Sequence, residues 1–340
     1  MNAPLFCKND TIRELYCQYL ENNLPFEGEV LQDKTSEGNE KPWREKKLMN
    51  ENLAKVYGEI DEKKQARLLD CGKFLEFKVY ADGTKKLHSM SSCRVRLCPL
   101  CAWRRSLKMF HNNLEIVKYL MTQKDYAFIF LTLTVKNCNA DELTATIDHL
   151  AKAVNRLYLR PEWKKAVKGA CKALEVTHNV NRKSKYFDTF HPHMHFILCV
   201  NKSYFTSSSY LSHKKWVDLW QSVLHVDYRP IVNVKKCYDT AEKAVAECSK
   251  YSVKSVEYVI PEDWVLSVNT VRVLDKALAN RRLISYSGVF KTAKQILCLE
   301  DEETGSLIDV GDAVDKLDEP FVLQSYYWYS GYRQYISIEK

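Results

Sequence analysis

The stretch His191-Pro192-His193-Met194-His195-Phe196-Ile197-Leu198-Cys199-Val200 decides the fold of this chain, because its apolar run predicts a strand that enters a core. Side chains alternate between the two faces of a strand, so His193 and His195 point the same way while the apolar residues between them point inward. His191 shares the histidine face, but Pro192 predicts that the regular strand begins only after it. Two imidazoles on one strand face form half of a divalent metal site.

The segment before this stretch supplies a third candidate ligand. Residues 170–178 predict a strand, and the short basic loop at 179–190 favours antiparallel pairing with the histidine strand. Glu175 then lies opposite the histidines and is the predicted third ligand; the alternative is an exposed strand glutamate. A set of imidazole and carboxylate ligands with open positions suits Mn²⁺ or Mg²⁺ acting on a phosphate better than a closed zinc site does.

The pattern around these two strands predicts an α+β domain. Further strands are expected at 126–135 and 231–235, and helices at 141–160, near 216–223 and at 240–254. The first helix has an apolar stripe made of Leu143, Ile147, Leu150, Val154 and Leu157. We therefore expect an antiparallel central sheet covered by helices on one side.

The predicted helix at 240–254 carries a candidate nucleophile. Glu247 and Tyr251 are four residues apart and share a helix face, and Lys254 lies one turn further. A tyrosine hydroxyl can displace a DNA oxygen and hold the phosphate covalently, and a nearby carboxylate can later activate water. The alternative is an ordinary helix surface, in which case Tyr258 or Tyr238 is the next candidate nucleophile.

A compact module is predicted at 61–110. A hairpin with strands at 74–80 and 85–90 is followed by three closely spaced cysteines and preceded by a fourth, which together are Cys71, Cys93, Cys98 and Cys101. Thiolates at this spacing favour a structural, tetrahedral Zn²⁺. His88 is the competing fourth ligand, and the alternative to a zinc site is a set of free core cysteines.

Four arginines accompany the last three cysteines and argue against a plain apolar core. They are Arg94, Arg96, Arg104 and Arg105. Arginine is a common ligand of DNA phosphates, so we expect these side chains to bind DNA.

Composition supports a nucleic-acid-binding protein. The chain has 340 residues and a net charge of +8, but residues 300–319 carry nine acidic side chains and one basic one, which leaves +16 on the rest. A basic body with 20 Tyr, 13 Phe and 7 Trp suits a polyanion whose bases can stack on aromatic rings. No membrane span or signal peptide is expected, so we predict a cytoplasmic protein with metal-bound or buried cysteines.

The predicted organisation has four parts. Residues 1–60 form an N-terminal extension with a short helix near 11–20 and a flexible linker at 21–52, and residues 61–110 form the zinc module. Residues 111–260 form the catalytic domain. Residues 261–340 form a C-terminal region with a helix at 269–282 and the acidic segment.

With these pieces in place, the chain resembles the rolling-circle replication initiators of small bacterial plasmids, within the HUH endonuclease superfamily. The resemblance covers residues 65–290 and rests on four motifs in the family's order. They are Cys93-Arg94-Val95-Arg96-Leu97-Cys98-Pro99-Leu100-Cys101-Ala102-Trp103-Arg104-Arg105-Ser106, Phe130-Leu131-Thr132-Leu133-Thr134, His191-Pro192-His193-Met194-His195 and Lys250-Tyr251-Ser252-Val253-Lys254.

The resemblance implies an HUH endonuclease-like fold and a site-specific nick in one strand of a plasmid double-strand origin. Tyr251 would be joined to the 5′ phosphate, and a free 3′ hydroxyl would prime a host polymerase. His193 and His195 match the metal-binding pair, and Glu247 matches the carboxylate that lets water end the reaction. The implied partners are supercoiled origin DNA with an extruded single-stranded hairpin, a host helicase and a host polymerase. Both monomeric and dimeric forms stay open.

Two other functions are compatible with the motifs. The first is a relaxase- or transposase-type HUH nickase, although relaxases usually carry the tyrosine near the N-terminus and such transposases are shorter and lack the cysteine module. The second is a non-catalytic, zinc-dependent DNA-binding regulator, which predicts neither metal-dependent cleavage nor a covalent adduct.

Overall fold

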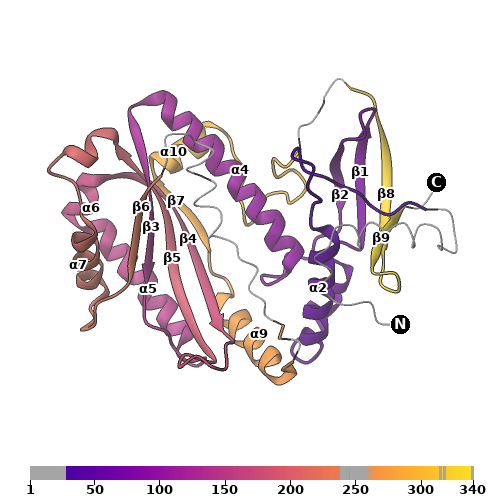
Figure 1. Cartoon of the computed structure of the whole chain (residues 1–340), viewed down its shortest axis with the longest axis horizontal. Helices are drawn as coiled ribbons and strands as arrows, with labels where there is room; N and C mark the ends of the chain where they lie inside the picture. Colours follow the sequence, from indigo (N-terminus) through magenta and orange to yellow (C-terminus); the bar gives the residue numbers. More distant parts are fainter. Residues whose placement is uncertain are drawn as a thin grey trace.

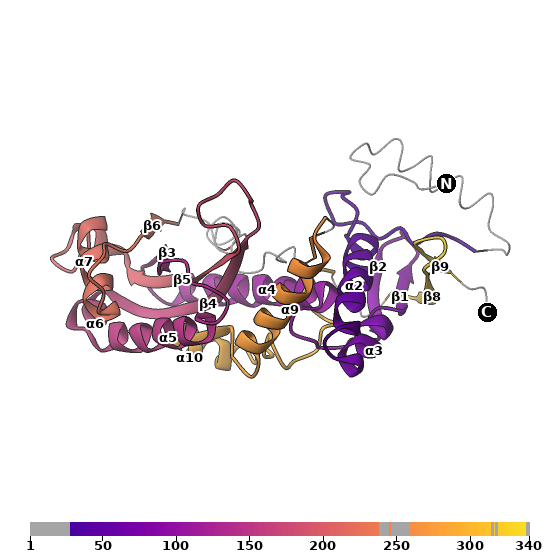
Figure 2. The ribbon, with the colours of Figure 1, turned by 90° about the horizontal axis from the view of Figure 1, so that it is seen from below.

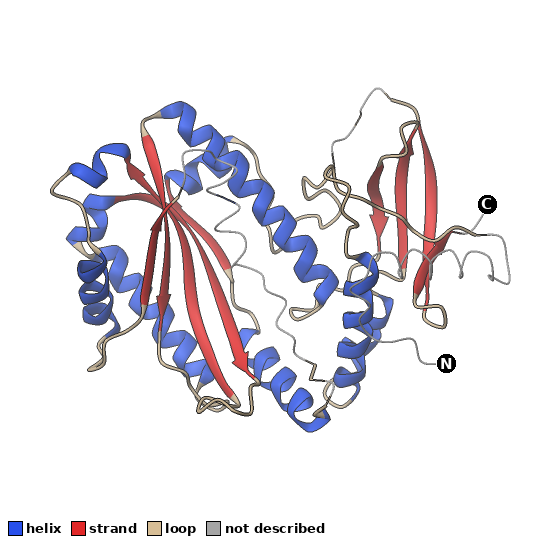
Figure 3. Ribbon diagram, viewed as in Figure 1, coloured by secondary structure: helices blue, strands red, loops and turns tan. Residues whose placement is uncertain are grey.

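The structure is a computed structural model that describes residues 28–237, 245, 259–260, 262–313, 316 and 319–337. Its strands form two separate antiparallel sheets, one of five strands and one of four (Figures 1 and 3). Long helix α4 (Pro99–Gln123) runs from the smaller sheet to the larger one. Within the described residues, no helix combines the length and apolar character needed to cross a membrane.

The larger sheet contains the histidine strand at its centre and confirms the predicted α+β class with an antiparallel central sheet. The strand order is β6-β3-β5-β4-β7, and every neighbouring pair is antiparallel. The strands are β3 (Tyr126–Thr134), β4 (Val167–Asn179), β5 (Thr189–Asn201), β6 (Val232–Lys236) and β7 (Ile284–Gly288).

Strand β5 begins before Pro192, contrary to expectation. At Pro192 the strand pairs with Val176 of β4, whereas its regular pairing with β3 starts only at His193. Proline lacks a backbone N–H, so it is tolerated where only one side of the strand is paired. His191 therefore belongs to the same strand face as the other two histidines.

Helices cover both faces of this sheet, which corrects the expectation of a single covered side. One face packs on α5 (Leu143–Leu159), whose predicted apolar stripe is fully buried. Helices α6 (Pro161–Ala166), α7 (His213–Leu224) and α9 (Trp264–Leu278) and the short 3-10 helix η1 (Lys202–Thr206) complete this side. Part of the other face is covered by α4 and by α10 (Val289–Ile296) in a second apolar cluster.

The smaller sheet joins distant parts of the chain. Its order is β2-β1-β8-β9, with β1 (Phe74–Tyr80), β2 (Lys85–Met90), β8 (Phe321–Tyr329) and β9 (Gln334–Ser337). The predicted 74–80 and 85–90 hairpin is confirmed. The C-terminal region, however, is not a separate unit, because β8 and β9 complete this sheet while β7 and α10 join the larger one.

The predicted linker at 21–52 is folded in its C-terminal part. Helix α2 (Trp43–Gly58) begins inside it and is followed by α3 (Glu62–Asp70), and Trp43 and Leu53 are 2% and 1% exposed. The sequence pattern did not indicate this helix, because its apolar residues have only weak periodicity and the helix also buries the polar residues Lys47 and Asn50. The predicted helix near 11–20 lies outside the described residues.

The acidic segment is packed against α4. Arg104 of α4 donates to Asp312 at 2.8 Å and to the Leu307 carbonyl at 2.9 Å, and Lys108 is paired with Glu300. Glu302 is fully buried and accepts from Lys294 at 2.6 Å. The segment therefore neutralises basic side chains of the body within the molecule.

Candidate metal centres and active site

Strand register brings Glu175, His193 and His195 together on one face of the larger sheet. Glu175 of β4 lies opposite His193 of β5, and His195 lies opposite both Ala173 of β4 and Thr132 of β3. Alternation places all three side chains on the face away from α5, beside the part that α4 and α10 cover. The sequence-based placement of Glu175 opposite the histidines thus agrees with the register.

The three side chains converge on a single point. Glu175 Oε2 lies 3.1 Å from His193 Nε2 and 2.8 Å from His195 Nε2, and one ligand atom from each residue lies within 4.8 Å of the others. Glu175, His193 and His195 are 8%, 9% and 5% exposed. Burial alone would raise the pKa of Glu175, but the hydrogen bonds from both imidazoles lower it to about 2.

The hydrogen-bond partners of His193 indicate that a cation belongs between these groups. His193 Nδ1 lies 3.0 Å from the carbonyl oxygen of His191, which can only accept, so Nδ1 donates. Its Nε2 faces the Glu175 carboxylate, which also only accepts when ionised. A proton or a metal ion must therefore lie between Nε2 and the carboxylate. Two imidazoles and one carboxylate with open positions fit a divalent cation.

Thr132 is a site residue that the sequence reasoning did not identify as functional. Its Oγ1 lies 3.0 Å from His195 Nδ1, so this hydroxyl can hold the ring with Nε2 toward Glu175. The signal in the sequence was the Phe130-Leu131-Thr132-Leu133-Thr134 motif, which carried the resemblance but had no role assigned.

We expect Thr132→Val to lower the affinity for Mn²⁺ by about 10- to 100-fold, because groups that orient a ligand histidine typically contribute that much. Calorimetric titration of the full chain with Mn²⁺ measures the change. Thr134→Val is the matched control, since the Thr134 hydroxyl donates to the Ile231 carbonyl at 2.9 Å and not to a ring. Equal Mn²⁺ affinities for the wild type and Thr132→Val would show that Thr132 does not orient His195 for metal binding.

The candidate catalytic residues Glu247, Tyr251 and Lys254 lie outside the described residues. The described position nearest to Glu247 and Tyr251 is Val245, which is fully buried in the second apolar cluster. That cluster includes Phe130 and Ile197, which are on the same sheet face as His195.

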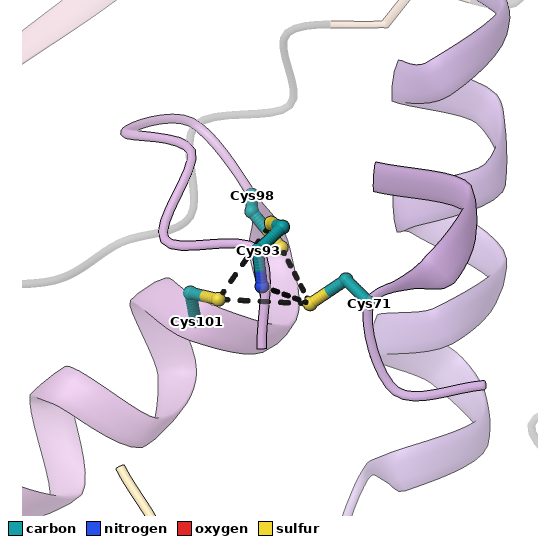
Figure 4. Close-up of side chains that lie close together, drawn as sticks. All are labelled: Cys71, Cys93, Cys98 and Cys101. Carbon is teal, nitrogen blue, oxygen red and sulfur yellow. Dashed lines mark hydrogen bonds between the residues drawn. The ribbon is translucent and has the colours of Figure 1, made fainter. Parts of the chain in front are cut away.

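The four predicted cysteine ligands form a second convergent cluster (Figure 4). Cys71 Sγ lies 3.6 Å from the Sγ atoms of Cys98 and Cys101, and Cys93 Sγ lies 3.8 Å from that of Cys101. Tetrahedral zinc with Zn–S bonds of ~2.3 Å requires sulfur–sulfur distances of ~3.8 Å. The thiols therefore fit zinc, whereas the alternative ligand His88 is exposed on β2 and lies outside the cluster.

The pKa shifts within the cysteine cluster have opposite directions, because hydrogen bonds with Cys101 and Cys93 raise the pKa of the Cys71 thiol and burial raises that of the Cys98 thiol. Hydrogen bonds from Cys71, Cys93 and Cys98 lower the pKa of the Cys101 thiol below its usual range. Lys47, which is 1% exposed, donates to the carbonyl of Cys71 at 2.7 Å and places a positive charge behind the cluster. Sequence reasoning missed Lys47 because it lies in the segment that was interpreted as a linker.

The four arginines predicted to bind DNA all have hydrogen-bond or ion-pair partners within the protein, and DNA binding by them stays a prediction. Arg104 is fully buried and donates to Asp312, whereas Arg105 is 9% exposed and donates to the Arg96 carbonyl. Arg96 pairs with Glu303 at 3.2 Å, and Arg94 donates to the carbonyls of Thr304 and Gly305. The acidic segment supplies most of these partners, and its fold could not be inferred from charge alone.

The chain is similar to known replication proteins. A family model described as replication protein matches residues 84–336. A Protein rep of Bacillus amyloliquefaciens is 34% identical over 337 residues, which cover 90% of this chain and 97% of that protein. A Protein rep of Lactiplantibacillus plantarum is 37% identical, with 84% and 90% covered, and one of Streptococcus pneumoniae is 33% identical, with 85% and 90% covered. No solved structure matches significantly.

Proposed function

The chain belongs to the replication protein family, and on this premise we propose that it initiates plasmid rolling-circle replication by nicking one strand of the double-strand origin. The convergence of Glu175, His193 and His195 on one sheet face carries the proposal. A Mn²⁺ or Mg²⁺ ion held there would polarise a phosphodiester. The antiparallel sheet with this centre on its middle strands also supports an HUH endonuclease-like fold.

In the proposed nicking step, the Tyr251 hydroxyl attacks the scissile phosphorus. A bond forms between phosphorus and the tyrosine oxygen, and the bond to the 3′ oxygen breaks. The tyrosine hydroxyl releases its proton to solvent, and the 3′ oxygen takes up a proton from solvent and leaves as the hydroxyl that primes synthesis by a host polymerase, while the 5′ phosphate stays on Tyr251. Buried Val245 supports this role, because it packs on the histidine-bearing face only six residues before Tyr251.

Termination is proposed to use water in place of a second tyrosine. Glu247 removes a proton from a water molecule, whose oxygen bonds to the phosphorus. The bond from phosphorus to the tyrosine oxygen breaks, and that oxygen takes up the proton held by Glu247. A covalent attack by a second residue would leave the enzyme attached, whereas hydrolysis frees it. Lys254 belongs to the same proposed catalytic segment. The four-cysteine cluster is proposed to bind a structural Zn²⁺, and the partners are supercoiled origin DNA and a host helicase.

The proposed function is tested by trapping the covalent intermediate. The full chain is incubated with supercoiled plasmid carrying a candidate origin and Mn²⁺, denatured and digested, and the DNA-linked peptide is sequenced. We expect an adduct at Tyr251, and we expect Tyr251→Phe to form none while still binding DNA, because only the hydroxyl is lost. Absence of any adduct would favour a non-catalytic DNA-binding regulator, and an adduct in Tyr251→Phe would assign another tyrosine.

A further inference from the structure

The loop between β4 and β5, residues 180–188, extends beyond the Glu175–His193 pair at one end of the larger sheet. Figure 2 shows this loop bending away from the side of the sheet that α5 covers. Glu175, His193 and His195 also lie on the side away from α5, because the residues that alternate with them along β4 and β5 pack on α5. The hairpin thus directs its loop toward the space in front of the candidate metal centre.

Exposed cations and an exposed aromatic ring dominate the loop. Lys183 and Lys185 are exposed, and Tyr186 is 46% exposed with the Lys185 ammonium 4.9 Å from its ring centroid. Arg182 is paired with Asp263 of the segment before α9. The acidic residue of the loop, Asp188, contacts His178 Nε2 at 2.9 Å. The loop therefore presents positive charge and a flat ring to solvent.

We propose that the β4–β5 loop binds the single-stranded DNA next to the scissile phosphate, with Lys183 and Lys185 on phosphates and Tyr186 stacked on a base. This inference rests on the proposed nicking function. The loop starts five residues after Glu175, a distance of ~17 Å at ~3.3 Å per residue. With a rise of ~3.4 Å per stacked nucleotide, the loop reaches bases about five positions from the cleaved bond.

A single strand fits this loop better than a duplex does. Every unpaired base offers a face on which an exposed tyrosine can stack, and such stacking is independent of sequence. In a duplex the bases are already stacked, so Tyr186 would have no face to cover.

The test measures binding of fluorescein-labelled oligothymidylate to the full chain by anisotropy at several salt concentrations, without added divalent cation. We expect Lys183→Ala/Lys185→Ala to weaken binding about tenfold and to reduce the slope of log K against log salt by ~1.4, since each phosphate contact contributes ~0.7. Tyr186→Ala should weaken binding about tenfold, whereas Tyr186→Phe should bind normally because its ring is kept.

The matched control is Lys63→Ala/Lys124→Ala, which removes two exposed lysines, one on α3 and one at the end of α4, and should bind like the wild type. The proposal would be overturned if both double variants lost binding affinity equally, or if the Lys183→Ala/Lys185→Ala variant lost none. It would also be overturned if duplex DNA competed with the labelled oligonucleotide as well as single-stranded DNA does. The covalent-adduct assay separates the two hypotheses. If the adduct forms but the loop variants bind DNA normally, the proposal for the loop is wrong and the nicking function stands. If the loop variants lose DNA binding but no adduct forms, the nicking function is wrong and the role of the loop stands.

Discussion

Replacing His193 and His195 together with Gln is expected to abolish metal-dependent nicking, with a rate loss of at least about a thousandfold, or ~4 kcal/mol of activation free energy. A glutamine amide can still donate to Glu175, so the buried carboxylate keeps a partner, but it is a poor ligand for a divalent cation. The measurement is the conversion of supercoiled to open-circular plasmid at saturating Mn²⁺, together with Mn²⁺ affinity by calorimetry.

The matched control for this experiment is His191→Gln. Its side chain is on the same strand face, with its ring centroid 5.3 Å from that of His193, but it is not part of the metal group. The carbonyl of residue 191 that accepts from His193 is unchanged by the substitution. We expect nearly normal Mn²⁺ binding and nicking. Metal-dependent nicking in the double variant, or its loss in His191→Gln alone, would show that the centre is assigned to the wrong residues.

The second large expected effect is a loss of stability when the proposed zinc site is disrupted. We expect one zinc per chain in the wild type by elemental analysis and none in Cys101→Ser. Because binding free energies at structural zinc sites reach about 10–16 kcal/mol, the variant should lose several kcal/mol of unfolding free energy. The cluster joins the end of α3, the segment after β2 and the start of α4. Release of α4 should therefore loosen its packing on the larger sheet.

The control for the zinc experiment is Cys298→Ser, which replaces an exposed cysteine outside the cluster. It should keep both zinc and melting temperature. A Cys101→Ser variant with full zinc content and an unchanged melting temperature would contradict a structural four-cysteine site. A variant that loses zinc but melts normally would show that the metal does not stabilise the fold.

Local patterns predicted most elements of the larger sheet and its covering helix α5, and also the first hairpin of the smaller sheet. The apolar stripe of the 141–160 helix is the buried face of α5, and the 74–80 and 85–90 hairpin has the bounds of β1 and β2. These predictions rested on periodicity and turn residues within short windows, which local backbone geometry enforces. The helix predicted at 269–282 begins earlier, at Trp264, because Asp263 caps it by accepting from the Leu266 N–H.

Predictions about long-range packing were less successful. Strand β8 pairs with β1, about 250 residues earlier in the chain, and no local signal specifies that pairing. Helix α2 was missed because it buries polar side chains such as Lys47, which bonds to backbone carbonyls near the cysteines. The sequence did not indicate that Arg96 and Arg104 pair with Glu303 and Asp312, because these acidic partners follow about 200 residues later.

The amino-acid sequence by itself indicated which residues form the two candidate metal-binding groups, because strand alternation and cysteine spacing are local constraints that hold in any packing. Tertiary structure alone decided the surroundings of those groups: Thr132 behind His195, Lys47 behind the thiols, and the acidic segment on α4. The physical reason is that burial and charge pairing depend on which distant segments meet, and a pattern of residues along the chain does not contain that information.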